Sequence, residues 1–494
     1  MHYCLGSKPE IERVRKVANQ TTPRNWFSLI GNSDCSWRRA LATAALCGVC
    51  LVAPVAQAAK TQIRIEDAPS DRVLAFNISI ASPIVLTHPN GTKVNVAIPA
   101  ANRVEFSHLS GQSMPLAIVN VPNGVYTSAT LTILNPAVQF IVSPRLSGFI
   151  TGSASQTITV PLALTIGPAS TILDINVNSS VALVADPTSG VISGINFTPA
   201  SMTITARPVS PIANQQDVSG QIEDATGTVT AVTATTTTGF TMVVGQSHAK
   251  LTFLTNSNTN FIAPLTGVVG LLNEIVKVEG VAQANGSLLA TRVEGLTASV
   301  GSELEGWSVG AVSSGGIASS VIMGVQDGAG TGVTSGDLGA GFNVNVSSLP
   351  SAKYQLALGN IDTSGLTVPG PLFPFDGSSI IGGQRIQVAS ASPLPVVGGT
   401  LVANVVKLKQ QSITGQVTTI NGTSVPRTIV ITLPLDSAVH IQSHLTTLTM
   451  TVYQQPGTDN RWGAFGIGDT IRVRGLLFNA GGTLNMIARR ILTP

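Results

Sequence analysis

Three stretches of the sequence share one pattern around a glycine: Val218-Ser219-Gly220-Gln221-Ile222, Leu304-Glu305-Gly306-Trp307-Ser308 and Ile413-Thr414-Gly415-Gln416-Val417. Three later stretches are also alike: Gly286-Ser287-Leu288-Leu289-Ala290, Gly399-Thr400-Leu401-Val402-Ala403 and Gly482-Thr483-Leu484-Asn485-Met486. The opening and closing glycines of the three copies lie 66, 93 and 67 residues apart. Such self-similarity predicts a tandem module. The middle copy then carries about 27 additional residues, to which we assign the glycine-rich stretch 327–341.

The strand expected before each closing motif alternates in character. Ile275-Val276-Lys277-Val278-Glu279-Gly280 and Ile471-Arg472-Val473-Arg474-Gly475 separate apolar side chains on one face from charged side chains on the other. Short runs of Val, Ile and Thr between glycine turns are typical of all-β proteins. We predict three tandem, small OB-like β-barrels: residues 218–298 (repeat 1), 302–410 (repeat 2) and 411–494 (repeat 3).

The preceding region, residues 60–208, also predicts strands. Phe76-Asn77-Ile78-Ser79-Ile80 and Val94-Asn95-Val96-Ala97-Ile98 alternate, and Pro89-Asn90-Gly91-Thr92 between them predicts a hairpin turn. Further strands are expected at 125–133, 172–177 and 202–206. We predict a β-sandwich of the immunoglobulin or transthyretin type, joined to the repeats by a linker at residues 209–217. Tyr126 is expected to cap its own sheet with its hydroxyl.

Two motifs of this N-terminal region resemble an uncharacterised family of secreted bacterial β-domains with D-A-P-x-D and P-x-G-x-Y elements: Ile65-Glu66-Asp67-Ala68-Pro69-Ser70-Asp71 and Val121-Pro122-Asn123-Gly124-Val125-Tyr126-Thr127. The repeats have G-x-V-x-x-V openings such as Gly227-Thr228-Val229-Thr230-Ala231-Val232 and V-x-V-x-G closings such as Val276-Lys277-Val278-Glu279-Gly280. In these features they look like a second uncharacterised bacterial module, an OB-like barrel often found in tandem. Together the two resemblances cover residues 60–494. They imply export and architecture, and no particular chemistry.

The first 58 residues read as a secretion leader. Ser36-Trp37-Arg38-Arg39 precedes the apolar run 40–55, which ends in Ala56-Gln57-Ala58, so a basic segment, an apolar segment and a small-residue cleavage site occur in order. We expect cleavage after Ala58 and export to the periplasm, the cell surface or the medium. The alternative is an uncleaved anchor helix, because residues 40–59 carry no charge and 20 such residues are just long enough to span a bilayer.

Composition and charge narrow the function further. Only 10% of the 494 residues are charged and 4% are aromatic, which excludes coiled coils and charge-driven disorder. All four cysteines lie in the leader, and residues 60–494 hold 20 basic and 21 acidic side chains. The mature chain therefore lacks the basic field of a nucleic-acid binder, and we expect no disulfide, no nucleic-acid partner and no membrane span after cleavage.

Two sets of residues suggest catalytic or metal chemistry. Gly306-Trp307-Ser308-Val309-Gly310 matches the G-x-S-x-G nucleophile pattern, with Asp436 and His440 following in hydrolase order, but the residues after Ser308 are poor helix formers and a nucleophile elbow needs a helix there. His440 and His444 have metal-ligand spacing only in a helix, and their surroundings look strand-like. We therefore expect no catalytic residue, no metal and no cofactor.

The last segment of the chain is basic. Arg472 and Arg474 alternate with apolar residues on one expected strand, and Arg489 and Arg490 follow near the C-terminus. One interpretation is that these arginines keep an exposed sheet face soluble. The other is that they contact an anionic envelope polymer, because Arg makes bidentate contacts with phosphate and carboxylate.

The sequence as a whole predicts an exported, non-catalytic protein for envelope attachment, adhesion or glycan and polymer binding, with envelope polysaccharide as its partner. A secreted hydrolase is the first alternative. The second is single-strand nucleic-acid binding, which rests only on the OB-like barrels and lacks interleaved aromatic residues.

Overall fold

In the computed structural model, the N-terminal region of the chain forms two sheets. The structure describes residues 58–68, 73–109, 113–143, 146–186, 191–209, 221–234, 238–262, 264–295, 301–314, 316–446, 448–460 and 464–492. The predicted leader lies outside the described residues, except for Ala58, and most of the predicted linker does too. One sheet has four strands in the order β13 (Met202–Pro208), β10 (Thr171–Asn178), β1 (Ala58–Ala68), β6 (Ser113–Pro122). In it, β1 runs parallel to β10 and antiparallel to β6.

The second sheet is built around β7 (Gly124–Ser143), a strand of 20 residues. Its other strands are β2 (Val73–Ile80), β3 (Ile84–Thr87), β4 (Lys93–Val96), β5 (Val104–Glu105), β8 (Leu146–Thr151) and β9 (Ser155–Ile166). Side chains from both sheets, such as Ile63 and Phe76, share one apolar core, so the two sheets form a sandwich. The helix α2 (Ser179–Ala182) and the hairpin of β11 (Leu183–Ala185) and β12 (Ile192–Ile195) complete it.

The strands expected in this region are confirmed, with one change of connection. The turn at 89–92 joins β3 to β4, where His88 N–H donates to the Thr92 carbonyl at 2.8 Å. The sequence pattern predicts that this turn joins β2 to β4, and it gives no sign of β3. A four-residue strand such as β3 is too short for its alternation to stand out.

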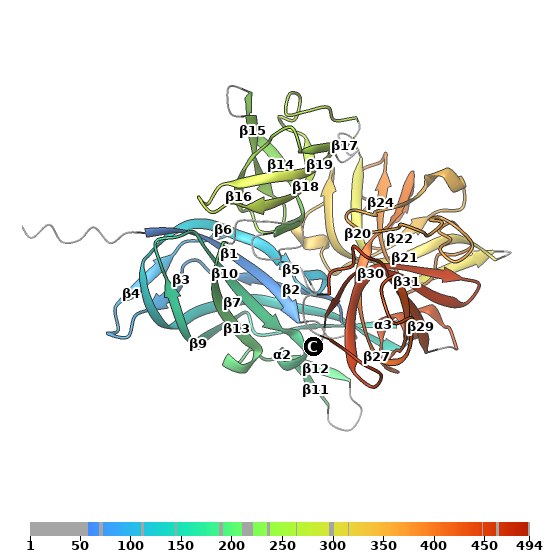
Figure 1. Cartoon of the computed structure of the whole chain (residues 1–494), viewed down its shortest axis with the longest axis horizontal. Coiled ribbons are helices and arrows are strands. Elements are labelled where there is room, and N and C mark those ends of the chain that lie inside the picture. Colours follow the sequence, from blue (N-terminus) through green and yellow to red (C-terminus); the bar gives the residue numbers. More distant parts are fainter. Residues whose placement is uncertain are drawn as a thin grey trace, which may run out of the picture. The chain divides into compact units, whose positions relative to one another are not determined.

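Repeat 1 closes a five-stranded barrel (Figure 1, light green to yellow). Its strands are β14 (Gln221–Ala234), β15 (Thr238–Val244), β16 (Lys250–Leu254), β18 (Ile275–Ala282) and β19 (Leu288–Gly295), with the short β17 (Asn260–Ile262) added beside β19. Antiparallel pairs lead from β16 through β15, β14 and β18 to β19. A parallel contact between β16 and β19 closes the ring.

Repeat 3 has the same strand order and is a closed barrel (Figure 1, red). Its strands are β27 (Gln410–Asn421), β28 (Arg427–Thr432), β29 (Thr449–Gln454), β30 (Thr470–Ala480) and β31 (Thr483–Leu492), and β29 and β31 form the parallel pair. The helix α3 (Ala438–Ser443) lies between β28 and β29. Five strands closing in this order make the small barrel of the OB type that the sequence predicts.

Repeat 2 follows the same order with a divided last strand. Its strands are β20 (Ser302–Ser314), β21 (Ile317–Gly330), β22 (Gly341–Asn345), β24 (Arg385–Ser390), β25 (Thr400–Val402) and β26 (Val405–Leu408), with β23 (Tyr354–Leu356) added beside β26. The parallel partner of β22 is β25, and the antiparallel partner of β24 is β26. The all-β, multi-module fold is therefore confirmed.

The glycine that ends the V-x-V-x-G pattern is required for the same structural reason in repeats 1 and 3. Gly280 in β18 and Gly475 in β30 each stand where the register with the following strand shifts. A Cβ atom on Gly475 would lie 2.1 Å from the Ile487 carbonyl oxygen, and one on Gly280 would lie 2.8 Å from that of Leu289. The motif therefore marks a bulge at which the partner backbone comes too close for a side chain.

The additional residues of repeat 2 lie mainly at 346–384, between β22 and β24, so their assignment to 327–341 was wrong. This insertion packs on repeat 3. The centroid of the Phe373 ring lies 4.9 Å from the centroid of the Tyr453 ring and 5.4 Å from that of the Phe478 ring. Both pairs are arranged edge to face. The Asp362 carboxylate accepts a hydrogen bond from Gly457 N–H at 2.8 Å. The glycine-rich stretch 327–341 instead forms the end of β21 and the connection from β21 to β22.

Residues Ala56–Pro494 form one compact unit, and its modules share apolar contacts. The core of repeat 2 includes Phe478 and Ile487 of repeat 3. A separate cluster joins Leu74 of the sandwich, Val309 of repeat 2 and Ala438 of repeat 3. Within the described residues, no helix has the length and apolarity needed to cross a membrane.

Candidate functional site

The four arginines predicted to contact a polymer do not form an exposed patch. Arg474 is 1% exposed and Arg490 is 2% exposed; Arg489 is also buried, and Arg472 is half-buried. The expectation that Arg472 and Arg474 share a solvent-facing side was therefore wrong for Arg474. The reason is that the outer side of the β30–β31 hairpin is covered by other modules of the unit.

Two of these arginines, Arg489 and Arg490, bind carboxylates of the chain itself. Arg489 Nη2 lies 2.7 Å from Glu223 Oε1, and Arg490 Nη2 lies 3.4 Å from the same oxygen. Arg490 Nε also lies 3.2 Å from Asp459 Oδ2. Because Glu223 belongs to β14, these pairs connect repeat 3 with repeat 1. Arg472 donates to the Thr414 hydroxyl at 3.4 Å.

The serine of the G-x-S-x-G motif lies inside a strand. Ser308 is fully buried in the middle of β20, and its backbone pairs with residues 383 and 384. Neither the Ser308 hydroxyl nor His440 Nδ1 has a hydrogen-bond partner in the described part of the chain, so the two do not bond to each other. The strand, turn and helix of a nucleophile elbow are not formed at this serine.

The two histidines lie in and after a short helix, where the sequence argument expected a strand. His440 belongs to α3, and His444 is the exposed residue that ends it, with φ of 57°. Among the described residues, no three His, Cys, Asp or Glu side chains lie together in a group that could hold a metal ion.

Tyr126 has a structural role, as expected, but its hydroxyl bonds to β6 of the first sheet and not to its own sheet. Its ring is fully buried, and its hydroxyl donates to the Pro122 carbonyl oxygen at 2.7 Å. Burial raises the pKa of the hydroxyl, so it stays protonated and can donate at physiological pH.

A buried cluster of charges lies where repeat 1 meets repeat 2. Glu305 of β20 is 2.7 Å from Lys277 Nζ, 2.6 Å from Arg385 Nη2 and 3.3 Å from Lys409 Nζ. Burial opposes ionisation of Glu305, but Lys277, Lys409 and Arg385 outweigh that effect and hold its pKa well below the usual value. Lys277 belongs to the charged face that the sequence predicts for its strand, and that side chain is only 5% exposed.

Glu303 lies two residues earlier on the same face of β20 and behaves in the opposite way. Burial raises the pKa of its carboxyl group to about 7, although Lys277, Lys407 and Lys409 favour the charged form. The neighbouring Glu305 carboxylate adds to the increase. The cluster therefore contains one carboxylate that stays ionised and one carboxyl group that titrates near neutral pH.

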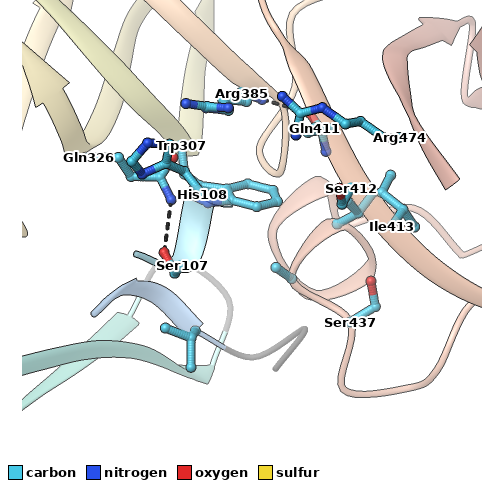
Figure 2. A pocket seen from close by; sticks show the side chains of 13 residues that line it. Ser107, His108, Trp307, Gln326, Arg385, Gln411, Ser412, Ile413, Ser437 and Arg474 are labelled. Atoms are coloured by element: carbon cyan, nitrogen blue, oxygen red, sulfur yellow. Dashed lines mark hydrogen bonds between the residues drawn. The ribbon is translucent and has the colours of Figure 1, made fainter. Parts of the chain in front are cut away.

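A pocket next to this cluster is formed by three modules, and we call it the junction pocket (Figure 2). It is a small pocket that is partly open to solvent. Its lining residues come from the sandwich, repeat 2 and repeat 3: Val73, Ser107, His108, Trp307, Gln326, Arg385, Gln411, Ser412, Ile413, Ser437, Ala438, Val439 and Arg474. Arg474 is the one predicted site residue in this pocket.

The polar side chains of the junction pocket are held by hydrogen bonds. Glu105 Oε2 lies 2.6 Å from His108 Nδ1, and Glu105 Oε1 accepts from Ser107 N–H at 3.0 Å. Arg385 N–H donates to Gln411 Oε1 at 2.7 Å. In Figure 2, Arg385 and Arg474 lie on one side of the Trp307 indole and Ser437 lies on the other. Sequence reasoning missed this pocket because its residues are far apart in the chain.

The outer side of the second sandwich sheet carries paired hydroxyl groups. The hydroxyls of Thr130 and Thr159 lie 3.0 Å apart, and those of Thr132 and Thr157 lie 2.9 Å apart. Thr157 and Thr159 are exposed on β9, and their partners are half-buried on β7. We call these four residues the threonine face. The adjacent Thr127 hydroxyl donates to the Thr87 carbonyl at 3.3 Å.

Comparison with models of known protein families and with curated proteins finds no match to this chain. The resemblance of residues 60–494 to two uncharacterised bacterial families therefore stays a prediction.

Proposed function

We propose that the protein is an exported, non-catalytic binding protein of the cell envelope, and that the threonine face binds an uncharged polysaccharide. The observation that carries the proposal is the threonine face itself. Its hydroxyls form two cross-strand pairs on the outer side of the sheet. Each pair uses one O–H donor, which leaves a second donor and several lone pairs for a ligand.

The spacing of the threonine face suits a polymer with repeated hydroxyl groups. Neighbouring strands lie about 4.8 Å apart, and every second residue along a strand lies about 6.7 Å further on. These distances let several hydroxyls bond to successive sugars at once, so weak single contacts add along the chain. Burial of Arg474, Arg489 and Arg490 favours this uncharged face over an arginine surface.

The proposal of export predicts a defined N-terminus. Cleavage after Ala58 leaves Ala59 as the first residue, and Ala59 is the β1 residue that pairs with Val121. The exported protein is therefore expected to keep β1 almost whole and to begin at Ala59. N-terminal sequencing of protein from the periplasm or medium checks this result. Exported chains that still carry the leader would contradict cleavage and favour an anchor.

Polysaccharide binding predicts that removing the exposed hydroxyls weakens retention. We expect the double variant Thr157→Val, Thr159→Val to bind an uncharged glucan or xylan about tenfold more weakly, because each lost hydrogen bond contributes about 0.5–1.5 kcal/mol. Valine keeps the shape and strand preference of threonine, so the fold should survive. Affinity electrophoresis of the full chain in gels that contain each polysaccharide measures the change.

The matched control uses a similar pair in repeat 1. The hydroxyls of Thr241 and Thr252 lie 2.9 Å apart on β15 and β16. Thr241→Val, Thr252→Val should leave retention unchanged. Equal losses in both double variants, or no retention of the wild-type protein by any uncharged polysaccharide, would overturn the assignment of the threonine face.

A further inference from the structure

We infer that the junction pocket binds a small ligand with a carboxylate or phosphate group, which Arg474 and Arg385 hold, and that Ser437 contacts another part of the same ligand. This inference is independent of the threonine face, which lies on a different surface of the sandwich. The pocket is concave, is formed by three modules and combines polar and apolar walls, which is the usual character of a small-ligand site.

The first argument is the presence of two buried guanidinium groups in the lining. Arg474 is 1% exposed and Arg385 is 4% exposed. Arg385 uses Nη2 for Glu305 and Nη1 for the Gln410 carbonyl, at 2.6 Å and 3.2 Å. Its Nε is buried and makes no hydrogen bond to any residue that the structure describes. A buried donor without a partner costs stability, and an anion in the pocket supplies a partner.

The second argument is a set of neutral groups placed around the same space. The Ser437 hydroxyl is buried and makes no hydrogen bond within the described part of the chain. His108 is fixed by Glu105 through Nδ1, so its Nε2 remains for a ligand. A ligand hydroxyl beside the anionic group suits Nε2, because a hydroxyl group can either donate or accept a hydrogen bond.

The chemistry of the lining defines the ligand class. Guanidinium groups bind carboxylate and phosphate oxygens with good geometry. Trp307, Ile413 and Val439 add apolar surface to the lining, which suits the carbon skeleton of a ring. A sugar acid and a sugar phosphate both meet these requirements, since they share one anionic group, hydroxyls and a ring with apolar C–H faces.

Isothermal titration calorimetry with the full chain tests the inference. The probes are inorganic phosphate, glucose 6-phosphate, glucuronate and neutral glucose. Saturable binding of phosphate and glucose 6-phosphate, or of glucuronate, supports the site and identifies the anionic group. Glucose should show no comparable heat. The variant Arg474→Gln is expected to weaken binding by about tenfold or more, because a charge-assisted hydrogen bond is lost.

The matched control is Arg472→Gln. Arg472 lies on the same strand two residues earlier, is half-buried and does not line the pocket. It should leave the affinity unchanged. If Arg474→Gln does not fold, as judged by its circular dichroism spectrum and melting, Ser437→Ala decides the question with an expected loss of about threefold.

The inference fails if none of the anionic probes binds. It also fails if glucose binds as tightly as the anions, or if the folded pocket variant keeps the wild-type affinity. These outcomes do not depend on polysaccharide retention, which the Thr157→Val, Thr159→Val variant measures separately.

Discussion

Replacing Glu305 with glutamine is expected to lower the free energy of unfolding by about 3–5 kcal/mol at pH 7. The Glu305 carboxylate is the common partner of Lys277, Arg385 and Lys409, which are all buried. Glutamine has nearly the same shape, so the change removes a charge and creates no cavity. Three buried cations then lose their shared anion.

Urea unfolding of the wild-type protein and of Glu305→Gln measures this difference. Because the folded-state pKa of Glu305 is held below the usual value, its stabilisation is present above the unfolded pKa and is lost as the pH falls through the folded pKa. The difference between the two proteins should therefore shrink in acid. Glu274→Gln, at a half-buried carboxylate outside the cluster, should change the free energy of unfolding by less than about 0.5 kcal/mol. A loss for Glu305→Gln no larger than this control would contradict the role of the cluster.

Replacing Glu303 with glutamine should instead raise the free energy of unfolding near neutral pH. Burial raises the folded-state pKa of Glu303 to about 7 from 4.5. A raised carboxyl pKa contributes stability that is fully present below the unfolded pKa and is lost as the pH rises through the folded pKa. Glutamine does not titrate, so it does not lose this stability. As the pH rises from about 4.5 to 7, the free energy of unfolding of Glu303→Gln should therefore increase relative to that of the wild-type protein by on the order of 2–3 kcal/mol.

The measurement is the pH dependence of unfolding for both proteins from pH 4 to 8. All other titrating groups are shared, so the difference between the two curves isolates Glu303. Parallel curves would show that Glu303 does not titrate in this range. Glu303 and Glu305 occupy neighbouring positions on the same face of β20, and both variants replace glutamate with glutamine. If the two variants change the free energy of unfolding in opposite directions, the cause is the charge environment of each site and not the substitution itself.

The amino-acid sequence predicts the strands and the repeated barrels well because both depend on local patterns. The alternation in Ile471–Arg474 places Ile471 and Val473 in the core of repeat 3. The glycine of the V-x-V-x-G pattern marks the bulge at Gly475. These features need only the neighbouring strand of the same module, so the information lies within a short stretch of chain.

Short or irregular segments were less predictable. Residues 438–443 form the helix α3 where a strand was expected, and β3 was missed between two recognised strands. Both segments have too few residues for a period to be measured, and contacts with the rest of the unit decide their conformation. The position of the insertion in repeat 2 was also misjudged, because a count of residues between glycines gives its length but not its place.

The candidate site depends most on tertiary structure. The alternation of apolar and charged residues in β30 and β18 predicts which side chains point out of a barrel. This pattern alone shows that Arg474 and Lys277 lie outside the cores of their own modules. Whether the outside of a barrel faces water or another module is decided by packing between segments hundreds of residues apart. That packing buried Arg474, Arg489 and Arg490, paired Glu223 with the last strand, and assembled the junction pocket from the sandwich, repeat 2 and repeat 3.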